Sequence, residues 1–141
     1  MWVKVLAAMH YPPGDSPWHW VQTPNPDWPA IEAAIRRLDR NEWPFVWLHK
    51  DEPLEDEPPL GGLCIMGGRG EYNLFSWRGD TPALYYTDTS RSGKWVRIWE
   101  SDQGSEEGER FLCSDIGRVL AMICFFIDRG EMDPSAVWVE R

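Results

Sequence analysis

The chain has 141 residues, a formal net charge of −9 and ten tryptophans. This length suits one domain with its own core. The negative net charge argues against a protein that binds the phosphate backbone of a nucleic acid. The apolar runs are too short for a membrane span, and the first six residues lack the features of a secretory signal. We therefore expect one cytoplasmic domain, residues 1–141, with no direct contact to nucleic acid or membrane.

The N-terminal half is predicted to contain two strands, a helix and one irregular segment. Alternation and β-branched residues in Trp2–Ala8 predict a strand. The segment Tyr11–Pro29 holds six prolines, so we expect a stiff aromatic connection without regular structure. Asp27 can cap a helix over Trp28–Asp39, which has a proline in its first turn and apolar residues at helical spacing. The apolar run Phe45–His49 predicts the next strand.

The C-terminal half is predicted to contain five strands and a second helix. The strands are Leu63–Met66, Tyr72–Trp77, Leu84–Thr87, Trp95–Trp99 and Val137–Val139. The glycine-rich run at 67–70 predicts a hairpin turn between the first two. Together the elements predict an α+β fold, a mostly antiparallel sheet of six to seven strands with two helices packed on it.

The second helix, over Ile116–Ile127, is the most apolar element and is predicted to be the core helix. Its apolar residues recur at helical spacing and extend well beyond a single narrow stripe. Ser114 can accept a hydrogen bond from the first-turn amides, Asp115 faces the positive helix end, and Gly130 suits the residue that closes a helix.

Two acidic segments, Asp51–Glu57 and Glu100–Glu109, each carry five carboxylates and are predicted to be exposed loops. Each follows a strand that contains tryptophan. Carboxylates beside aromatic anchors favour a basic protein partner, because charge speeds the encounter and buried rings slow departure. A charge run that only keeps a tryptophan-rich protein soluble is the alternative. The candidate partner-binding residues are Glu55, Asp56, Glu57, Trp77, Trp95, Trp99, Glu106 and Glu107.

The residue pattern predicts no catalytic, cofactor or metal site. The glycines at 67–70 lack the strand-loop-helix context of a phosphate-binding loop, and the three histidines are scattered without ligand spacing. The three cysteines are expected to be buried free thiols. Cys113, at a helix start, is the only thiol with a reason for a lowered pKa, and we interpret it as structural.

Several short motifs, in order, resemble the first immunity-protein family of bacterial polymorphic toxin systems. The resemblance covers about residues 28–140. It rests on Leu38-Asp39, Gly67-Gly68, the tyrosine-containing strands, Ala121 and Phe126 in the helix that runs to Gly130, and the terminal Trp138-Val139-Glu140. The chain departs from the family in Tyr11–Pro29 and in a longer acidic segment near Glu106. Trp138 is expected to pack in the fold rather than to contact a partner.

Members of that family are small α+β cytoplasmic proteins that bind and inactivate a toxin, commonly a deaminase or a nuclease. The resemblance therefore implies a non-catalytic inhibitor whose partner is a basic toxin domain acting on nucleic acid. The ten tryptophans leave room for a homodimer as well as a monomer. The alternative is a small enzyme or ligand-binding domain with an aromatic cleft formed by Trp18, Trp20 and Trp28. An adaptor whose proline-rich stretch is itself a ligand ranks last.

Overall fold

The computed structural model describes residues 3–14, 16–52, 61–77 and 82–141. Within these ranges nine strands, two α-helices and one short 3-10 helix follow one another along the chain. In order they are β1 (Val5–His10), β2 (His19–Pro24), α1 (Trp28–Arg37), β3 (Phe45–His49), β4 (Gly62–Gly68), β5 (Glu71–Trp77), β6 (Leu84–Thr87), β7 (Trp95–Trp99), β8 (Ser105–Gly108), η1 (Glu109–Phe111), α2 (Ile116–Arg129) and β9 (Val137–Glu140).

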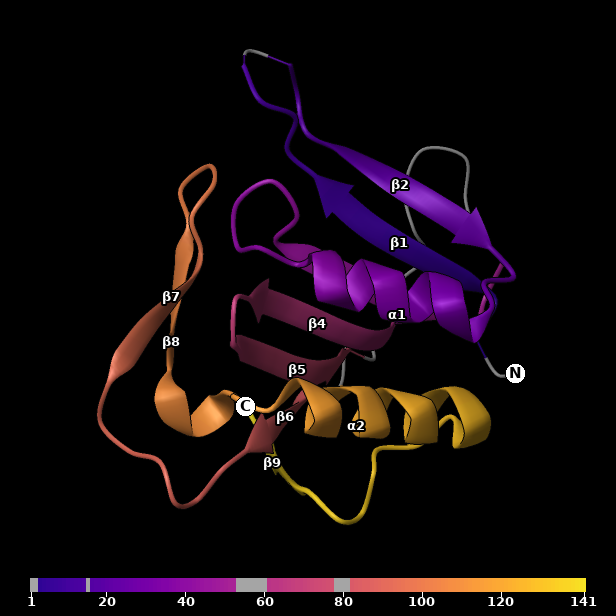
Figure 1. Cartoon of the computed structure of the whole chain (residues 1–141). Helices are drawn as coiled ribbons and strands as arrows, with labels where there is room; N and C mark the ends of the chain where they lie inside the picture. Colours follow the sequence, from indigo (N-terminus) through magenta and orange to yellow (C-terminus); the bar gives the residue numbers. More distant parts are fainter. Residues whose placement is uncertain (1–2, 15, 53–60, 78–81) are drawn as a thin grey trace.

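Seven of the strands form one antiparallel sheet in the order β2-β1-β3-β4-β5-β6-β9, and β7 pairs only with β8. Figure 1 shows α1 and α2 on the same face of the large sheet, with the β7–β8 hairpin standing beside the ends of β4 and β5. The predicted α+β class, with a mostly antiparallel sheet and two helices packed on it, is confirmed.

The main core lies between the sheet and the two helices. Ile31 and Ile35 of α1 and Val119 and Ile123 of α2 are completely buried there, against aliphatic side chains of β1, β3, β4 and β5. The predicted capping residues are found at the helix ends, except at the start of α2, and α2 extends two residues beyond the predicted Ile127, to Arg129. Asp115, not Ser114, caps α2, because its carboxylate accepts the Arg118 amide at 3.3 Å, and the helix closes at a left-handed Gly130.

The predicted first helix ends two residues earlier than expected, because the chain turns toward the sheet after Arg37. Asp39 forms a bridge with Gly68 at the end of β4. A Cβ atom at Gly68 would collide with the Leu38 carbonyl, so only glycine permits this close approach. The predicted hairpin turn is present at Arg69 and Gly70, both with positive φ, while Gly67 and Gly68 belong to the strand. The glycine run thus allows the close contact between β4 and the end of the first helix, and it also forms part of the hairpin turn between β4 and β5.

Two predictions of irregular structure are wrong. Residues of the proline-rich segment form β2, which pairs with β1 over its whole length. The prolines lie outside the run 18–23, and Pro24 ends an edge strand, where a missing amide is tolerated. Part of the second acidic segment forms β8, which pairs with β7 through an antiparallel ladder that is irregular between Arg97 and Trp99. Side chains on the outer face of a two-stranded hairpin can stay in water, so the charge of the carboxylates there does not prevent the two strands from pairing.

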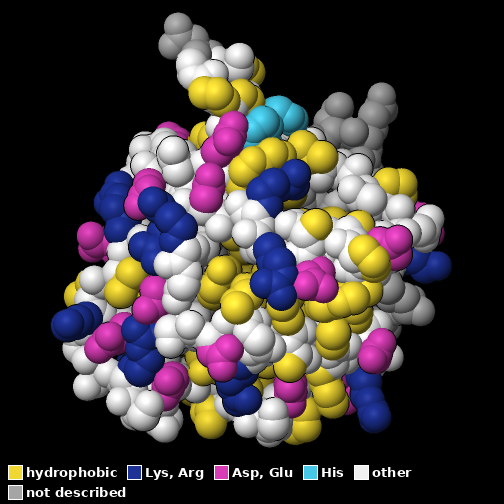
Figure 2. All heavy atoms as spheres, in the orientation of Figure 1, with side chains coloured by type: hydrophobic (Ala, Val, Ile, Leu, Met, Phe, Trp, Pro, Cys, Tyr) yellow, Lys and Arg dark blue, Asp and Glu magenta, His cyan; other side chains and the backbone are white. Residues whose placement is uncertain are grey.

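The helix-covered side of the molecule has a mixed surface. Figure 2 shows Lys and Arg side chains interspersed with Asp and Glu over this side, with apolar side chains between them. Neither sign of charge gathers into one patch in this view. Within the described ranges, neither helix has the length and apolar character needed to cross a bilayer.

Candidate functional site

The opposite face of the sheet carries aromatic side chains instead of helices. Because alternate residues of a strand point to opposite faces, partners in register share a face. One such row crosses six neighbouring strands through residues that pair in succession: Ala7, Trp47, Cys64, Phe75, Tyr85 and Val139. A second, smaller apolar cluster forms on this helix-free face around Met9, Phe45 and Trp47.

A hollow of about 300 Å³ opens in this cluster. We call it the aromatic hollow, and it is lined by Met9, Trp20, Phe45, Trp47, Cys64, Phe75 and Trp99. The Phe45 ring is central, with its centroid 6.1 Å from Trp20, 6.1 Å from Trp47, 6.4 Å from Phe75 and 6.2 Å from Trp99. Phe45, Trp47 and Cys64 are buried, whereas Trp20, Phe75 and Trp99 are partly exposed. The hollow therefore has a buried floor and accessible walls.

The β7–β8 hairpin supplies one wall through Trp99, and Arg40 fixes its position. The Arg40 guanidinium donates to the carbonyls of Gly68 (2.8 Å), Arg69 (3.1 Å) and Arg97 (3.2 Å), joining the β4–β5 turn to β7. The Glu100 amide donates back to the Arg40 carbonyl at 2.6 Å, and Arg69 forms an ion pair with Glu100. Hydrogen bonds and an ion pair thus hold the wall in addition to apolar packing.

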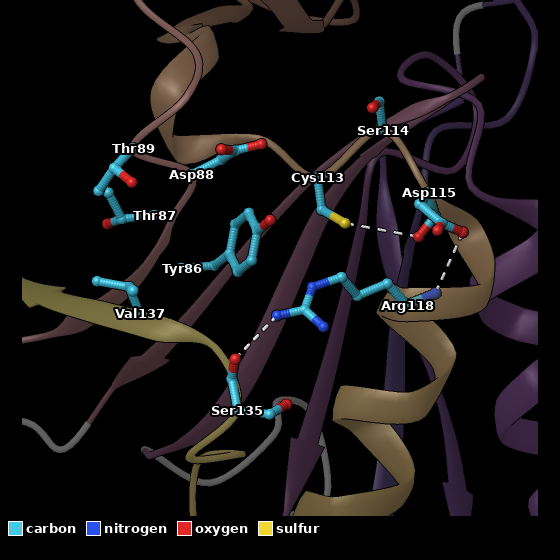
Figure 3. A pocket seen from close by; sticks show the side chains of 10 residues that line it. All are labelled: Tyr86, Thr87, Asp88, Thr89, Cys113, Ser114, Asp115, Arg118, Ser135 and Val137. Atoms are coloured by element: carbon cyan, nitrogen blue, oxygen red, sulfur yellow. Dashed lines mark hydrogen bonds between the residues drawn. The ribbon is translucent and has the colours of Figure 1, made fainter.

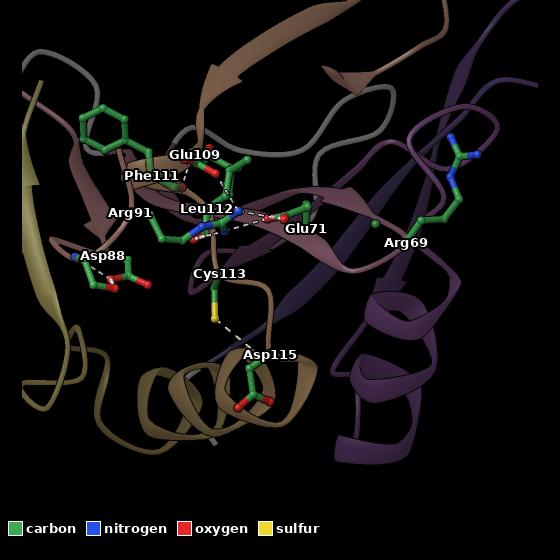
Figure 4. A network of polar contacts seen from close by, with 12 residues as sticks. Arg69, Glu71, Asp88, Arg91, Glu109, Phe111, Leu112, Cys113 and Asp115 are labelled. Atoms are coloured by element: carbon green, nitrogen blue, oxygen red, sulfur yellow. Dashed lines mark hydrogen bonds and ion pairs between the residues drawn. The ribbon is translucent and has the colours of Figure 1, made fainter. Parts of the chain in front are cut away.

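The other end of the hairpin is fixed by Arg91, shown in Figure 4. Its guanidinium forms a bidentate ion pair with Glu71, with both N–O distances at 2.9 Å. It also donates to the Glu109 carboxylate at 3.3 Å and to the Leu112 carbonyl at 3.1 Å. The hydrogen bonds to Glu71 raise the pKa of Arg91 above its usual value. A bidentate pair fixes the relative orientation of the two side chains more closely than a single hydrogen bond does. It joins β5 to the segment that follows β8.

The predicted partner-binding residues divide into two groups. Trp95, Trp99, Glu106 and Glu107 lie together on the β7–β8 hairpin. Trp95 is 69% exposed and Glu106 is exposed, but Glu107 is mostly covered and bound to Arg141 at 3.0 Å. Trp77 ends β5 opposite Gly62, and its side chain lies outside the described part. The acidic residues Glu55, Asp56 and Glu57 also lie outside the described residues.

Sequence reasoning predicts only a part of the hollow. The alternative of an aromatic cleft includes Trp20, which is one wall, but not Phe45, Trp47 or Phe75, which belong to the floor and the other walls. The available signal was the apolar run of β3, in which residues pointing to both faces are apolar. Such a run indicates that both faces of the strand are covered, and it therefore pointed to an apolar cluster on each side of the sheet. Trp28, grouped with Trp18 and Trp20 beforehand, packs instead against the main core.

His49 lies beside the floor of the hollow and is almost wholly buried, at 1% exposure. Its ring centroid is 4.3 Å from that of Trp47. Burial lowers the pKa of His49 to about 4, although the nearby Asp51 and a backbone hydrogen bond with Gly61 act in the opposite direction. The imidazole is therefore neutral at physiological pH and adds no charge to this face.

A second pocket, of about 320 Å³, lies between the end of β6 and the start of α2 and is polar (Figure 3). Burial raises the pKa of both Tyr86 and Cys113, which hydrogen-bond to each other, and Tyr86 also bonds to Arg118. The Cys113 thiol donates to the Asp115 carbonyl at 3.5 Å, and Arg118 donates to the Ser135 carbonyl at 3.2 Å. The polar groups of this pocket therefore hydrogen-bond with one another. The raised pKa of the Cys113 thiol disfavours a role for Cys113 as a nucleophile.

The histidines are less scattered than expected. His10 and His19 are partners across β1 and β2, with ring centroids 5.1 Å apart. His10 also stacks on Trp43 at 3.9 Å and contacts Glu42 at 3.2 Å. No set of three or more potential ligands among the described residues is arranged to hold a metal ion. Cys64 and Cys113 are buried free thiols as predicted, and Cys124 is a partly buried one.

Trp138 packs as expected. It is partly buried against the main core, its ring lies edge-on to Tyr86 with centroids 6.1 Å apart, and its indole N–H donates to the Asp133 carbonyl at 2.8 Å.

Comparisons of this chain with protein-family models, with curated proteins and with solved structures find no match. The aromatic hollow and its hairpin wall are therefore interpreted from their own geometry.

Proposed function

We propose that this protein is an immunity protein of the cytoplasm that binds a cognate bacterial toxin and blocks the toxin's active site. The observation that carries the proposal is the aromatic hollow on the helix-free face, which offers partly exposed rings around a buried apolar floor. Large aromatic residues at the centre of an interface supply most of its binding energy. The resemblance of the sequence to the first immunity-protein family points in the same direction.

The lining of the hollow favours binding over catalysis. Its residues are apolar or aromatic, and the one titratable group among them, the Cys64 thiol, has its pKa raised well above the usual value by burial. A pocket with this lining can take up an apolar or aromatic group, or the face of a flat cation, from a partner.

The charge of the chain favours a basic partner. A net charge of −9 creates a negative field that attracts a positive surface, and toxins that act on nucleic acids commonly present a positive groove. Glu106 and Trp95 project from the hairpin next to the wall of the hollow. An interface of standard size, about 800 Å² on each partner, would then cover the hollow and the hairpin together.

Co-expression tests the proposal. The protein encoded immediately upstream is produced with and without this chain, and cell survival and copurification are scored together. We expect survival and a one-to-one complex. A toxic neighbour that kills regardless of this chain, or survival without a complex, would contradict inhibition by direct binding.

Two matched tryptophan variants then locate the contact. Trp20→Ala removes a wall of the hollow, whereas Trp28→Ala removes a partly buried tryptophan packed against the main core. We expect the first to weaken the complex by about 2 kcal/mol or more, the range of a hot spot, and the second to leave affinity unchanged in the folded protein. Equal affinities would move the interface away from the hollow.

Charge reversal tests the electrostatic part. The combined variant Glu55→Lys, Asp56→Lys, Glu57→Lys and Glu106→Lys should have a much lower association rate at low salt and a slightly lower one at high salt. Glu131→Lys, an exposed position after α2, gives the single reversal to compare with Glu106→Lys alone. An association rate that does not respond to the hairpin charge would remove steering from the proposal.

The second candidate is a small-ligand site in the same hollow. It is favoured by the volume of about 300 Å³, which lies at the lower end of small-molecule pockets. Thermal unfolding in the presence of a library of flat aromatic compounds separates the two. A stabilising compound that does not compete with the protein partner would favour this candidate.

A further inference from the structure

We propose that the aromatic hollow is a receptor for an arginine side chain of the protein partner. The inference deepens the proposed function and rests on it for the identity of the partner, whereas the chemistry of the hollow can be tested by itself. Three features of the molecule support it: the orientation of the rings, a carboxylate near the rim and an arginine of the chain itself that binds on the same face.

The rings around the hollow are set at steep angles to one another. The Phe45 ring is inclined by 72° to Trp20, by 90° to Trp47 and by 63° to Phe75. Walls of this kind present ring faces as well as edges, and the face of an aromatic ring carries the negative part of its quadrupole. A cation seated among several such rings is attracted by each of them.

The lining disfavours polar neutral ligands. A sugar or a nucleobase has hydrogen-bonding groups that need partners, and the apolar walls would leave them unsatisfied at a cost. The Trp99 indole N–H, one of the few polar groups near the hollow, donates to the Ser101 hydroxyl at 2.9 Å. A guanidinium differs because its planar face is weakly hydrated and stacks on aromatic rings while its edge stays free for acceptors.

A carboxylate stands beside the rim. Asp102, at the turn of the β7–β8 hairpin, accepts a hydrogen bond from the Tyr11 hydroxyl. The Tyr11 ring in turn contacts Trp99, with centroids 6.0 Å apart, and packs on the cluster that forms the hollow. Asp102 thus lies one residue away from the Trp99 wall, through Tyr11, in a chain whose net charge of −9 favours the approach of a cation. The edge of a bound guanidinium can pair with such a carboxylate.

The same face already binds an arginine of the chain itself. The Arg141 guanidinium lies 4.5 Å from the Tyr85 ring centroid and 3.8 Å from that of Phe111, and it pairs with Glu107 at 3.0 Å. Tyr85 stacks on Phe75, a wall of the hollow, at 4.9 Å. Two rings and a carboxylate thus hold a guanidinium directly beside the hollow. The hollow repeats these components with more rings.

Titration of the full-length protein with two small probes tests the inference. N-acetyl-arginine amide carries the guanidinium, and N-acetyl-citrulline amide is its neutral counterpart of almost the same shape. The readout is the NMR shift of the Trp20 and Trp99 indole N–H signals, assigned with single Trp→Phe variants. We expect arginine to bind about fivefold more tightly than citrulline, the ratio that corresponds to a partly exposed cation–π contact. Equal binding, or shifts confined to indoles outside the hollow, would overturn the inference.

Matched variants keep the test independent of folding defects. Trp99→Leu should abolish the preference for arginine, whereas Trp95→Leu, on the same hairpin and 69% exposed, should preserve it. Asp102→Asn keeps every ring in place and should reduce arginine binding without changing citrulline binding, and Asp128→Asn at an exposed site of α2 is its control. A preference unchanged in both Trp99→Leu and Asp102→Asn would contradict the proposed site.

The outcome is separable from that of the proposed function. Arginine selectivity without protection in the co-expression experiment would support the receptor and contradict the immunity role. Protection and a stable complex with equal binding of the two probes would support the immunity role and overturn the arginine receptor.

Discussion

The two faces of the large sheet use the same strands for different purposes. On one face, residues such as Leu48, Ile65 and Leu74 are completely or almost completely buried beneath two helices. On the other, Phe45, Trp47 and Phe75 alternate with them along the same strands and surround a hollow. Mostly aliphatic side chains fill the covered face, together with a few rings such as Tyr72, Tyr86 and Phe126, and aromatic rings line most of the hollow on the open face.

The difference follows from what each face must do. Branched aliphatic side chains interlock at high density and leave no room between layers. Aromatic rings contact one another at edges and at larger centroid distances, so a partly covered cluster leaves usable space. We infer that the helix-covered face provides stability and the helix-free face provides recognition. This division of roles predicts different effects for substitutions on the two faces.

The largest effect is expected from truncating the covered face. Ile123→Ala in α2 empties a completely buried site and should cost about 4 kcal/mol of unfolding free energy, measured by urea denaturation. Trp99→Ala removes a larger side chain, yet it should cost only about 2 kcal/mol because Trp99 is partly exposed before the change. A greater loss for Trp99 than for Ile123 would mean that the open face is the main source of stability.

Acid should weaken the fold through His49. Its pKa is 6.5 in the unfolded chain and about 4 in the folded protein, so the unfolded state binds the extra proton first. The contribution of His49 is present above pH 6.5 and declines as the pH falls toward 4, by roughly 3 kcal/mol at most. His49→Gln should flatten this part of the stability profile, whereas the control His19→Gln, at an exposed site, should not. Parallel profiles for His49→Gln and the parent chain would contradict the assignment.

Loss of Arg91 should detach the lower end of the hairpin. Arg91→Ala leaves Glu71 and Glu109, both mostly covered, without their cation and should cost about 2 kcal/mol. Arg36→Ala breaks an exposed pair one turn apart on α1 and should cost under about 0.5 kcal/mol. Hydrogen exchange of the β7 and β8 amides gives the local readout. Unchanged protection of these amides in Arg91→Ala would show that the hairpin is held without Arg91, by the contacts of Arg40, Arg69 and Glu100.

The smallest stability effect is expected at the most exposed ring. Trp95→Ala should change the free energy of unfolding by under about 0.5 kcal/mol, because the side chain is already in water. If the hairpin contacts the partner, the same variant lowers affinity by more than about 1 kcal/mol, as titration calorimetry would show. A stability loss comparable to that of Trp99→Ala would place Trp95 in the fold instead.

Local patterns in the chain determined most of the elements. The spacing of Ile31, Ala34 and Ile35 fixed the buried side of α1, and Gly130 fixed the end of α2. The strands β3, β6 and β7 begin and end where predicted, because short apolar or β-branched runs are bounded by turn residues. These signals act over a few residues, so they can be recognised without knowing what lies across the fold.

Tertiary structure alone decided where the rings and the charges meet. β2 and β8 form because a neighbouring strand supplies hydrogen bonds to their backbone. The proline content of one segment and the glutamate content of the other do not predict this pairing. The hollow joins Trp20, Phe75 and Trp99 from distant segments, and Glu107 loses its role as a free surface charge only because Arg141 returns beside it. Pairing and burial depend on contacts between residues far apart in the sequence. A local pattern carries the kind of side chain available at each position, and the packing of the elements determines which of them become neighbours.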